Sequence, residues 1–335
     1  MAPLSHRRPD APTRAVHRMH VVHVSRWRLP VQGYGGVPRV LSWLAKAQAE
    51  QGDRVTILSP KGSRCPGATV IELPAGQSDY SPYVAGVLPA DADILHFHHM
   101  PAIAPPIPWV LTSHGNSAGE LQYLPNKIFV SADHARRGGA TAFVHNGLDP
   151  DEFIYRDRKD DYFLFLSKVS RRKKGVDVAL RLARRMGVRL LVAGGTRFSL
   201  RKTGGWWNSV RGRVHFCGEV SGRRKAELLA GARALLFPIR WEEPFGLVVT
   251  EALVSGTPVI TVPRGAMPEI VTPEVGFLCT SEDEMAAATA RVGDIDPAAC
   301  RRRVLEHFSN RQAAESYRRH YRDAIAAFGR PGGEA

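Results

Sequence analysis

Short apolar runs alternate with segments of helical apolar spacing along most of this chain, and this alternation constrains the fold more than any other feature. An apolar run at His20–Ser25 leads through a glycine-containing loop to a helical segment at Arg39–Glu50 and a second run at Val55–Leu58. Further apolar runs follow at Ile94–His98, Val110–His114, Ile128–Ser131 and Thr141–His145. Strands that alternate with helices predict a parallel sheet covered by helices on both faces.

A second alternation of the same kind begins after a break in the middle of the chain. Asn146–Pro150 is rich in turn-forming residues and Arg156–Asp161 is densely charged, so we place a domain boundary at residue 150. Beyond it the pattern predicts strands and helices at Tyr162–Leu166, Val176–Met186, Arg189–Ala193, Val214–Cys217, Arg223–Ala232, Ala234–Ile239 and Glu282–Val292. The prediction is an α/β protein with two parallel-sheet domains, residues 19–150 and 151–310, and a cleft between them.

The two ends of the chain differ from these domains. Residues 1–18 are rich in Arg, Pro and His and contain little that could be buried, which predicts a flexible basic extension. Residues 311–335 begin with an amphipathic helical segment, Arg311–Phe328, and end in a short tail. This helix is long enough to pack back on the first domain.

Composition limits the classes of function. With 335 residues, 44% hydrophobic and 23% charged, the chain is typical of a globular protein of about two domains. No apolar run approaches the roughly 18 residues that a membrane span requires, and the first residues lack the apolar centre of a signal peptide. We therefore expect a cytoplasmic protein. The cysteines are scattered, which predicts reduced thiols rather than disulfides or a zinc site: Cys65, Cys217, Cys279 and Cys300.

The formal net charge of +14 attracts polyanions. Nucleic acid, an anionic membrane surface and a nucleotide substrate are therefore all candidates. Basic clusters occur at 171–174 and in 301–322, but no RNP, zinc-finger or helix-turn-helix signature accompanies them. We do not expect a nucleic-acid partner.

The stretch Arg240–Ile260 is the most specific candidate for a binding site. Its pattern predicts a strand end, a tight turn at Pro244–Gly246, a short helix and a second strand. The helix begins at Phe245–Leu247, where unpaired backbone N–H groups and the helix dipole favour an anion such as a diphosphate. Glu243 and Glu251 flank this anion site, and a carboxylate there can bind the hydroxyls of a polyol.

Two other positions lie where ligands bind in open α/β sheets. Gly35 and Gly36 end the loop after the first strand, where a ligand can approach the backbone, although a simple turn is the alternative. His114 occupies the carboxyl end of a predicted strand, the edge of the sheet at which such ligands bind.

These residues together resemble the retaining glycosyltransferases of the GT-B fold, family four. The most specific part is Glu243-Pro-Phe-Gly-Leu followed by Glu251, the E-x7-E element of that family. Weaker matches follow the family's order and spacing: Tyr34-Gly-Gly-Val-Pro-Arg39, Asn146-Gly-Leu-Asp149, Lys174-Gly175 and Phe216-Cys-Gly218. The resemblance implies two Rossmann-like domains that face each other across a nucleotide-sugar cleft, with the first on the acceptor side and the second binding the donor.

The resemblance also implies a role for each matching position. His114, Glu243 and Lys174 are the implied catalytic residues. The implied donor-binding residues are Gly35, Gly36, Lys168, Lys173, Lys174, Gly218, Glu243, Pro244, Phe245, Gly246, Leu247 and Glu251. The chain has Ser167-Lys168 where the family usually has Gly-Arg, and one extra residue before Lys174 leaves Lys173 as an alternative contact to the diphosphate.

The implied activity is transfer of a hexose-type sugar from a nucleoside-diphosphate sugar, with a UDP-sugar favoured, to a hydroxyl of a saccharide, lipid-linked or small-molecule acceptor. No cofactor and no metal are expected, because lysines and oriented backbone amides would stabilise the leaving diphosphate. An anionic membrane surface is a further expected partner, which would place the protein peripherally at the inner face of the membrane.

Other functions compete with this interpretation. A nucleotide-sugar epimerase or hydrolase of the same fold would share the diphosphate site, and a basic non-enzymatic binder of nucleic acid or membranes would explain the charge. Gly115-Asn-Ser-Ala-Gly119 also matches the nucleophile elbow of serine hydrolases, although the short pattern recurs by chance.

Two motifs suggest metal binding. His96, His98 and His99 are close in sequence, but without an acidic or cysteine ligand at suitable spacing we interpret them as packing or surface residues. Three Asp-x-Asp pairs lie in turn-like contexts, where aspartates cap or bend the chain: Asp91 and Asp93, Asp149 and Asp151, Asp294 and Asp296.

Overall fold

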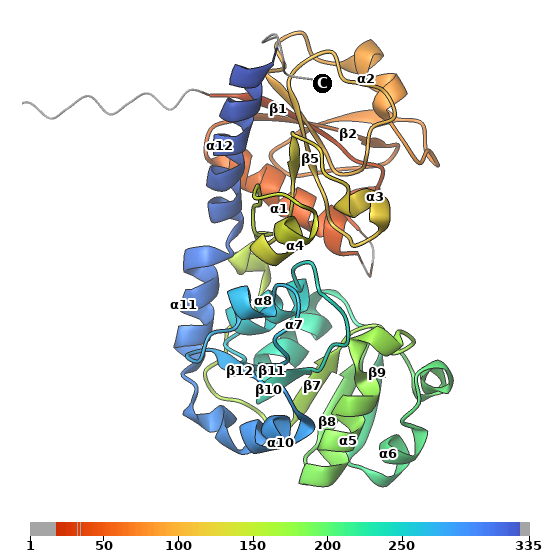
Figure 1. Ribbon diagram of the computed structural model, residues 1–335, viewed down its shortest axis with the longest axis vertical. Helices are drawn as coiled ribbons and strands as arrows, with labels where there is room; N and C mark the ends of the chain where they lie inside the picture. Colours follow the sequence, from red (N-terminus) through yellow and green to blue (C-terminus); the bar gives the residue numbers. More distant parts are fainter. Residues whose placement is uncertain (1–17, 32, 34, 329–335) are drawn as a thin grey trace, which may run out of the picture.

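The computed structural model describes residues 18–31, 33 and 35–328. The predicted basic extension lies outside the described residues except for Arg18, and so do Tyr34 and residues 329–335. Two α/β domains follow one another along the long axis of the molecule (Figure 1). Each is built around a six-stranded sheet in which every pair of neighbouring strands is parallel.

The N-terminal domain contains the first sheet and the helices that surround it. Its strands are β1 (His20–Val24), β2 (Arg54–Pro60), β3 (Thr69–Leu73), β4 (Ile94–Phe97), β5 (Trp109–Thr112) and β6 (Lys127–Ile128). Its helices are α1 (Gly36–Glu50), α2 (Ser81–Val87), α3 (Ala118–Leu121) and α4 (Ala132–Arg137). Every residue of β1, β4 and β5 is buried, as expected for strands covered on both faces.

The C-terminal domain follows a 3-10 turn, η1 (Pro150–Glu152). Its strands are β7 (Phe163–Leu166), β8 (Leu190–Ala193), β9 (Val214–Gly218), β10 (Ala234–Phe237), β11 (Val259–Thr261) and β12 (Gly276–Leu278). Its helices are α5 (Val176–Met186), α6 (Trp206–Arg211), α7 (Gly222–Gly231), α8 (Leu247–Val254), α9 (Met267–Ile270), α10 (Glu282–Arg291) and α11 (Pro297–His307), with 3-10 turns η2 (Arg172–Lys174), η3 (Arg197–Lys202) and η4 (Val292–Asp294).

The order of the strands determines where a ligand can bind. The first sheet runs β3-β2-β1-β4-β5-β6 and the second runs β12-β11-β10-β7-β8-β9, so both have the Rossmann order. In each sheet the connections go in opposite directions from the central pair, which is β1 and β4 in the first and β7 and β10 in the second. Ligands of such sheets bind beyond the carboxyl ends of this pair.

The last helix, α12 (Asn310–Ala327), returns to the first domain. It packs against α1 and β5, and it buries Ala313, Ala314, Tyr317 and Tyr321 in the core of that domain. Figure 1 shows it beside the N-terminal domain after α11 has followed the C-terminal one. The predicted α/β class, with two Rossmann-like domains and a returning C-terminal helix, is confirmed.

A few element predictions were wrong or absent. Thr141–His145 forms no strand, because its pairing is a single bridge between Phe129 and Phe143. The prediction omitted β3, an edge strand in which only Leu73 is buried, and α11, in which Cys300 and Val304 alone are buried. Neither segment buries enough apolar side chains to give a clear periodicity.

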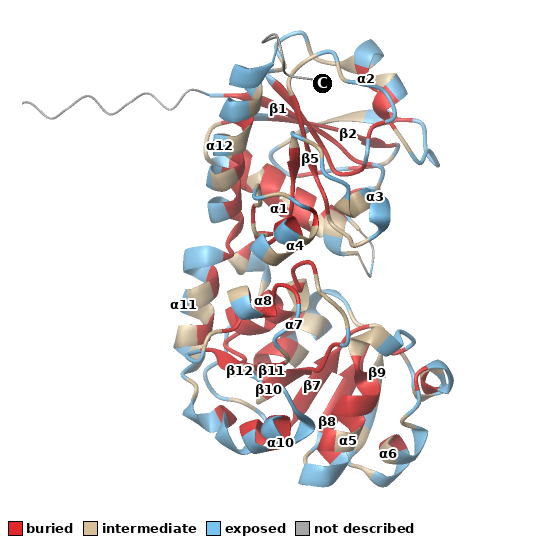
Figure 2. Cartoon of the chain, viewed as in Figure 1, coloured by how far each residue is buried: buried red, intermediate tan, exposed pale blue. Residues whose placement is uncertain are grey.

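Burial is concentrated in the two sheets and the surfaces of helices that face them (Figure 2). One apolar cluster crosses between the domains, since Val40, Trp43 and Val130 of the first pack with Phe245 and Val249 of the second. Among the described residues, no helix has the length and apolar character needed to cross a lipid bilayer.

Candidate active site

A pocket lies between the two domains at the carboxyl ends of the central strands of the second sheet. Leu166 ends β7 and Phe237 ends β10, and both line the pocket. The first domain contributes Gly36 from the start of α1 and His114 from the segment after β5. The pocket therefore occupies the position at which Rossmann-like sheets bind nucleotides.

Three cations from the segment after β7 line this pocket: Lys168, Arg171 and Lys174. Lys174 ends the short turn η2 and its Nζ lies 2.5 Å from Oε2 of Glu243. Nε1 of Trp241 donates to the same carboxylate oxygen over 2.7 Å. Glu243 is thereby held between an ammonium and an indole, with a side chain that is 12% exposed.

Lys173 is placed differently from Lys174. Its Nζ lies 3.4 Å from the ring centroid of Trp241, and it is not among the residues that line the pocket. Burial, followed by the charge of the neighbouring Lys174, lowers the pKa of Lys173. Of the two alternatives for the diphosphate contact, the geometry favours Lys174.

The turn before α8 provides backbone groups. Gly246 has φ 95°, a left-handed conformation that glycine adopts without strain, and it is the N-cap of α8. Pro244, Phe245, Gly246 and Leu247 all line the pocket. The N–H groups of the first helical turn have no partners within the helix, so they and the cations above provide a cradle for an anion.

Glu251 lies in a second pocket beside the first. The two pockets share Gly36 and Leu247 among their lining residues, so they adjoin each other. Oε1 of Glu251 accepts from Nη1 of Arg39 over 3.0 Å, and Oε2 lies 2.5 Å from Nζ of Lys225. Burial lowers the pKa of Lys225 despite the attraction of this carboxylate.

The sequence assigns no role to several of these residues. Arg39 appears there only as the end of a glycine-containing motif, and Lys225 on α7 carries no signal that distinguishes it from other surface lysines. Arg171 is part of a basic block, and Trp241 adjoins the E-x7-E element without matching it. Their functional position depends on contacts between distant parts of the chain.

The structure places most of the predicted site residues along this cleft. Those that line the first pocket are Gly36, His114, Lys168, Lys174, Glu243, Pro244, Phe245, Gly246 and Leu247. Gly35 and Glu251 line the second pocket. Lys173 and Gly218 line neither, and Gly218 ends β9, where its carbonyl accepts from N–H of Gly194 over 2.8 Å.

His114 is a neutral imidazole in the wall of the cleft. Burial lowers its pKa from 6.5 to about 3, with a smaller contribution from His134. Nε2 of His114 lies 3.2 Å from Nδ1 of His98. The ring can therefore offer a hydrogen bond to a ligand, but no positive charge at neutral pH.

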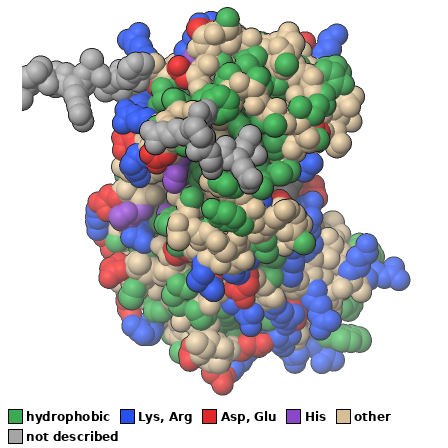
Figure 3. All heavy atoms as spheres, turned by 45° about the horizontal axis from the view of Figure 1, so that its top comes forward, with side chains coloured by type: hydrophobic (Ala, Val, Ile, Leu, Met, Phe, Trp, Pro, Cys, Tyr) green, Lys and Arg blue, Asp and Glu red, His purple; other side chains and the backbone are tan. Residues whose placement is uncertain are grey.

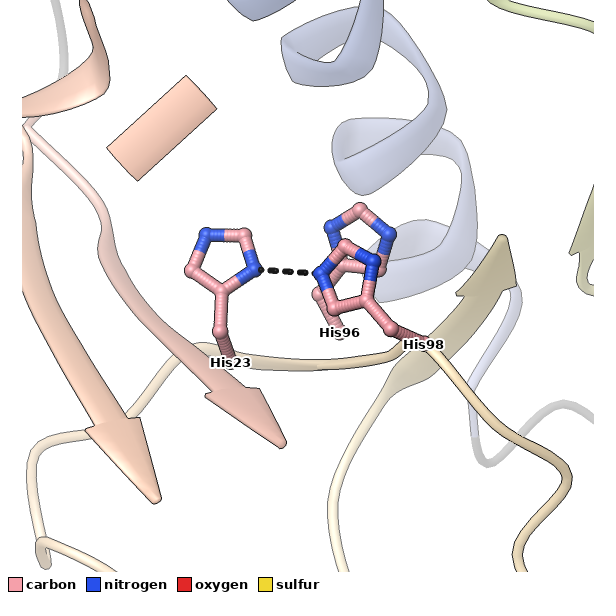
Figure 4. A group of neighbouring side chains, drawn as sticks. All are labelled: His23, His96 and His98. Carbon is pink, nitrogen blue, oxygen red and sulfur yellow. Dashed lines mark hydrogen bonds between the residues drawn. The ribbon is translucent and has the colours of Figure 1, made fainter. Parts of the chain in front are cut away.

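Behind His114 lies a group of buried histidines that resembles a metal site in composition. His23, His96 and His98 bring ring nitrogens within 4.8 Å of one another (Figure 4). However, the rings of His96 and His98 are stacked with centroids 4.3 Å apart and an interplanar angle of 26°. The lone pairs of stacked imidazoles lie in nearly parallel planes and cannot converge on one ion.

The hydrogen bonds of these histidines also account for every ring nitrogen. His23 bonds to His98 and Gln48, His98 bonds to His114, and His96 bonds to Tyr321 and Thr112. Of the two interpretations of His96, His98 and His99, packing is therefore correct, while the surface alternative is wrong because all three are buried. In this structure the cluster forms a hydrogen-bonded network.

The serine-hydrolase alternative does not fit the structure. Ser117 is exposed and is the N-cap of α3. Its Oγ donates to Oε2 of Glu120 over 2.6 Å, in a capping box. The glycines of this motif surround a helix start, and the partner of the hydroxyl is Glu120, the capping residue of that helix, instead of the histidine that a serine-hydrolase triad uses.

The Asp-x-Asp pairs have structural partners. Asp91 lies within 3.0 Å of Nδ1 of His20, and Asp149 caps η1 and pairs with Lys46 at 2.5 Å. Asp296 caps α11. These contacts are those of loop and cap residues.

Besides the Arg39–Glu251 pair, further hydrogen bonds join the domains around the cleft. Oγ of Ser131 donates to the carbonyl oxygen of Pro244 over 2.6 Å, and Nδ2 of Asn116 donates to that of Glu242 over 2.5 Å. The carboxylate of Glu269 accepts from the N–H groups of Ala132 and Asp133 at the start of α4. The domains are thus bound to each other on both sides of the E-x7-E turn.

Comparison with known proteins agrees with this arrangement. Residues 149–294 match the family model described as "Glycosyl transferases group 1". The phosphatidyl-myo-inositol mannosyltransferase of Mycolicibacterium smegmatis is 25% identical over 318 residues, which cover 78% of this chain and 81% of that protein.

Solved structures extend the likeness to the whole fold. AviGT4, a glycosyltransferase involved in avilamycin A biosynthesis, superposes with a TM-score of 0.75 at 28% identity, covering 92% of this chain and 98% of that one. A sucrose-phosphate synthase from Thermosynechococcus elongatus gives 0.72 at 21% identity, with coverage of 92% and 100%, and shares the fold. Residues 149–294 are thus similar to the group 1 glycosyltransferases, and the chain as a whole shares the GT-B fold of its structural neighbours.

Proposed function

We propose that the protein transfers a hexose from a nucleoside-diphosphate sugar to a hydroxyl acceptor, with retention of configuration and without a metal ion. The observation that carries the proposal is the pair of adjoining pockets, which bring together a group of cations at a helix start and the two carboxylates Glu243 and Glu251. A diphosphate fits the first group and sugar or ribose hydroxyls fit the second.

The chemistry requires stabilisation of a leaving group. When the bond from the anomeric carbon to the diphosphate breaks, negative charge develops on the leaving oxygen. Lys168, Arg171 and Lys174 line the pocket with the start of α8, and fixed donors of this kind stabilise the transition state more than the ground state. In this proposal Lys174 turns from Glu243 to the diphosphate, and Glu243 is then free to accept from a sugar hydroxyl.

The donor can be identified by binding and by hydrolysis. We expect one class of nucleoside-diphosphate sugar, a UDP-sugar in the first instance, to raise the melting temperature and to be slowly hydrolysed. Glu243→Ala should abolish most of this turnover, by roughly 100-fold or more. If no nucleotide sugar stabilises the protein, the proposal is wrong; consumption of donor without any acceptor requirement would favour an epimerase or hydrolase.

Two further features of the proposal have separate tests. Activity should persist in EDTA, because the cationic side chains take the place of a metal; loss in EDTA with rescue by manganese would contradict this. The anomeric configuration of the product, read from its NMR coupling constant, should equal that of the donor. An inverted product would reject retention.

We also propose that the protein works at an anionic membrane surface, and the phosphatidyl-myo-inositol in the name of the mycobacterial relative supports this. Residues 178–218 contain Arg and Lys but no Asp or Glu. Phe198 and Trp207 are 73% and 68% exposed in the same segment. On the face shown in Figure 3, Lys and Arg gather at the lower right, the side on which Figure 1 places α5 and α6.

Vesicle binding tests this surface. The protein should sediment with vesicles containing an anionic lipid and release at high salt, and Trp207→Ala should weaken binding because aromatic rings anchor at the interface. Trp241 of the cleft is not a suitable control, so we would use Tyr123→Ala, which removes an aromatic ring that is 58% exposed on the N-terminal domain. Equal loss in both variants would reject the assignment of this surface.

A further inference from the structure

A chain of buried hydrogen bonds leads from helix α1 to His114 in the cleft. Oε1 of Gln48 lies 2.7 Å from Nε2 of His23, and Nδ1 of His23 lies 3.2 Å from Nε2 of His98. Nδ1 of His98 then lies 3.2 Å from Nε2 of His114. Figure 4 shows the central bond of this chain, between His23 and His98. Gln48, His23 and His98 are all buried.

The direction of each hydrogen bond follows from the amide of Gln48. Its oxygen can only accept, so Nε2 of His23 carries a proton and donates. Burial lowers the pKa of His23 to about 4 and that of His98 well below 6.5, so both rings are neutral with one proton each. Nδ1 of His23 must therefore accept from Nε2–H of His98, and Nδ1 of His98 must accept from Nε2–H of His114.

The other end of the Gln48 amide is held by the C-terminal helix. Nε2 of Gln48 donates to the hydroxyl of Tyr321 over 3.0 Å. That hydroxyl lies 2.7 Å from Nδ1 of His96, and Nε2 of His96 lies 2.7 Å from Oγ1 of Thr112. With the amide nitrogen of Gln48 bonded to Tyr321, the amide oxygen faces His23.

We propose that Gln48, His23 and His98 are positioning residues that set the tautomer of His114, so that its proton is on Nε2 and Nδ1 remains a hydrogen-bond acceptor. The inference rests on the proposed function, in which His114 contacts the donor sugar. A sugar hydroxyl close to Nδ1 then donates a hydrogen bond to the ring. In the opposite tautomer Nδ1 carries the proton. The ring would then donate the hydrogen bond, and the sugar hydroxyl would accept it.

This assignment gives the buried histidines a purpose that packing alone does not. An imidazole without a fixed partner exchanges between tautomers, and a ring whose second nitrogen is bonded does not. The network also links the cleft to α12, since Tyr321 contacts both Gln48 and His96. Helix α12 thus contributes to the hydrogen-bonding state of His114, at the other end of the network.

The tautomer can be read directly in the wild-type protein. In a sample with 15N-labelled histidine, the protonated and bare nitrogens of a neutral ring have separate shifts and coupling patterns. The chain has 13 histidines, and the signals of His114 are assigned by their loss in His114→Gln. We expect Nε2 of His114 to be protonated and Nδ1 to be bare. A protonated Nδ1 would overturn the assignment, and this measurement needs no substrate.

Substitution of Gln48 tests the origin of the tautomer. Gln48→Met keeps the length of the side chain but removes the acceptor, so the signals of His114 should show both tautomers and kcat should fall roughly tenfold with little change in KM for the donor. Gln48→Glu restores an acceptor at His23 and should return kcat to within about threefold of wild type. The matched control is Gln51→Met, the same change at the residue that follows α1, whose side chain is bonded to the backbone carbonyl of Arg311.

The outcomes separate this inference from the proposed function. An unchanged His114 spectrum in a folded Gln48→Met protein would overturn the role of Gln48. Mixed tautomers with unchanged kcat would overturn the link to catalysis. If wild-type protein transfers no sugar, the proposed function fails, whereas the spectrum still decides the tautomer.

Discussion

At the scale of single residues, several ionic groups of the cleft are paired with each other. Lys174 is paired with Glu243, and Glu251 is paired with both Arg39 and Lys225. Each pair joins segments that are distant in sequence. A phosphate or hydroxyl that enters the cleft therefore exchanges partners with these groups and does not meet isolated charges.

The first prediction distinguishes Lys174 from Lys173. Lys174→Met should lower kcat by roughly 100-fold, because it removes a cation next to the leaving diphosphate. Lys173→Met should change kcat less than about threefold, since that ammonium is engaged with the ring of Trp241. Steady-state rates of both variants check this. A larger effect of Lys173→Met would assign the diphosphate contact to Lys173.

A second prediction at this scale concerns stability. Glu251→Ala leaves two cations in a site where the carboxylate was 4% exposed and Lys225 is 12% exposed. We expect a loss of about 3 kcal/mol in the free energy of unfolding, measured with urea. In the control, Glu227→Ala breaks an exposed pair on α7 and should cost at most about 0.5 kcal/mol. Equal losses in the two variants would mean that burial does not increase the contribution of the Glu251 ion pairs to the free energy of unfolding.

At the scale of elements, the glycine at the start of α5 determines how η2 is placed, and the glycine at its end provides a comparison. Gly175 and Gly187 have φ 77° and 65°, both left-handed. A Cβ atom at Gly175 would overlap the carbonyl oxygen of Pro238, whereas one at Gly187 would meet no atom within 4 Å. The turn that holds Lys174 can therefore lie against β10 only if residue 175 is glycine.

This difference makes a matched pair of substitutions. Gly187→Ala should cost about 1 kcal/mol for the unfavourable backbone conformation. Gly175→Ala carries the same penalty and a steric clash, so we expect at least about 2 kcal/mol more and a loss of transferase activity as Lys174 shifts. Thermal unfolding and rate measurements on the two variants check this. Similar losses of stability in the two variants would show that the backbone at Pro238 moves away from the added Cβ atom at little cost.

At the scale of the whole molecule, Glu269 joins the two domains. Its carboxylate accepts from Ala132 N–H at 2.9 Å, Asp133 N–H at 2.8 Å and Nε2 of His145 at 2.8 Å. Burial by itself raises the pKa of Glu269, but the hydrogen bonds from His145 and the two backbone groups hold it below 4.5. A carboxylate at a helix start is also favoured by the helix dipole.

Removing this contact should loosen the domain arrangement. We expect Glu269→Ala to increase the radius of gyration in small-angle X-ray scattering and to lower kcat/KM by roughly tenfold, because both domains line the cleft. Glu274→Ala, an exposed glutamate of the same domain, is the control. Unchanged scattering and unchanged rates in Glu269→Ala would show that the other contacts between the domains are enough to hold them in place.

The same contact predicts a pH dependence. The pKa of Glu269 is lower in the folded protein than its usual 4.5, so its stabilising contribution is fully present above pH 4.5 and is lost as the pH falls through the lowered value. Scattering should therefore be the same at pH 7 and pH 5. Opening of the domains within that range would assign the titration to another group.

The residue order alone is enough to predict the class of fold and the position of the candidate donor site. Buried parallel strands are continuous apolar runs, and helices repeat their apolar residues with the helical period. Both can therefore be predicted from the order of residues. The E-x7-E element was legible for the same reason, since a turn, a helix start and two carboxylates all lie within one short segment. Edge strand β3 and helix α11 were not, because they bury few side chains.

The pairing of charged and hydrogen-bonding side chains follows only from the tertiary structure. Arg39 and Lys225 converge on Glu251 from positions 212 and 26 residues away in sequence, and no local pattern encodes such a pairing. The sequence likewise predicts only packing or surface roles for the histidines behind the cleft, yet Gln48, His23, His98 and His114 form one hydrogen-bonded chain from three strands or strand ends and a helix. A pattern along the chain records burial, whereas hydrogen bonds and ion pairs depend on distances that exist only after the sheets and helices have packed.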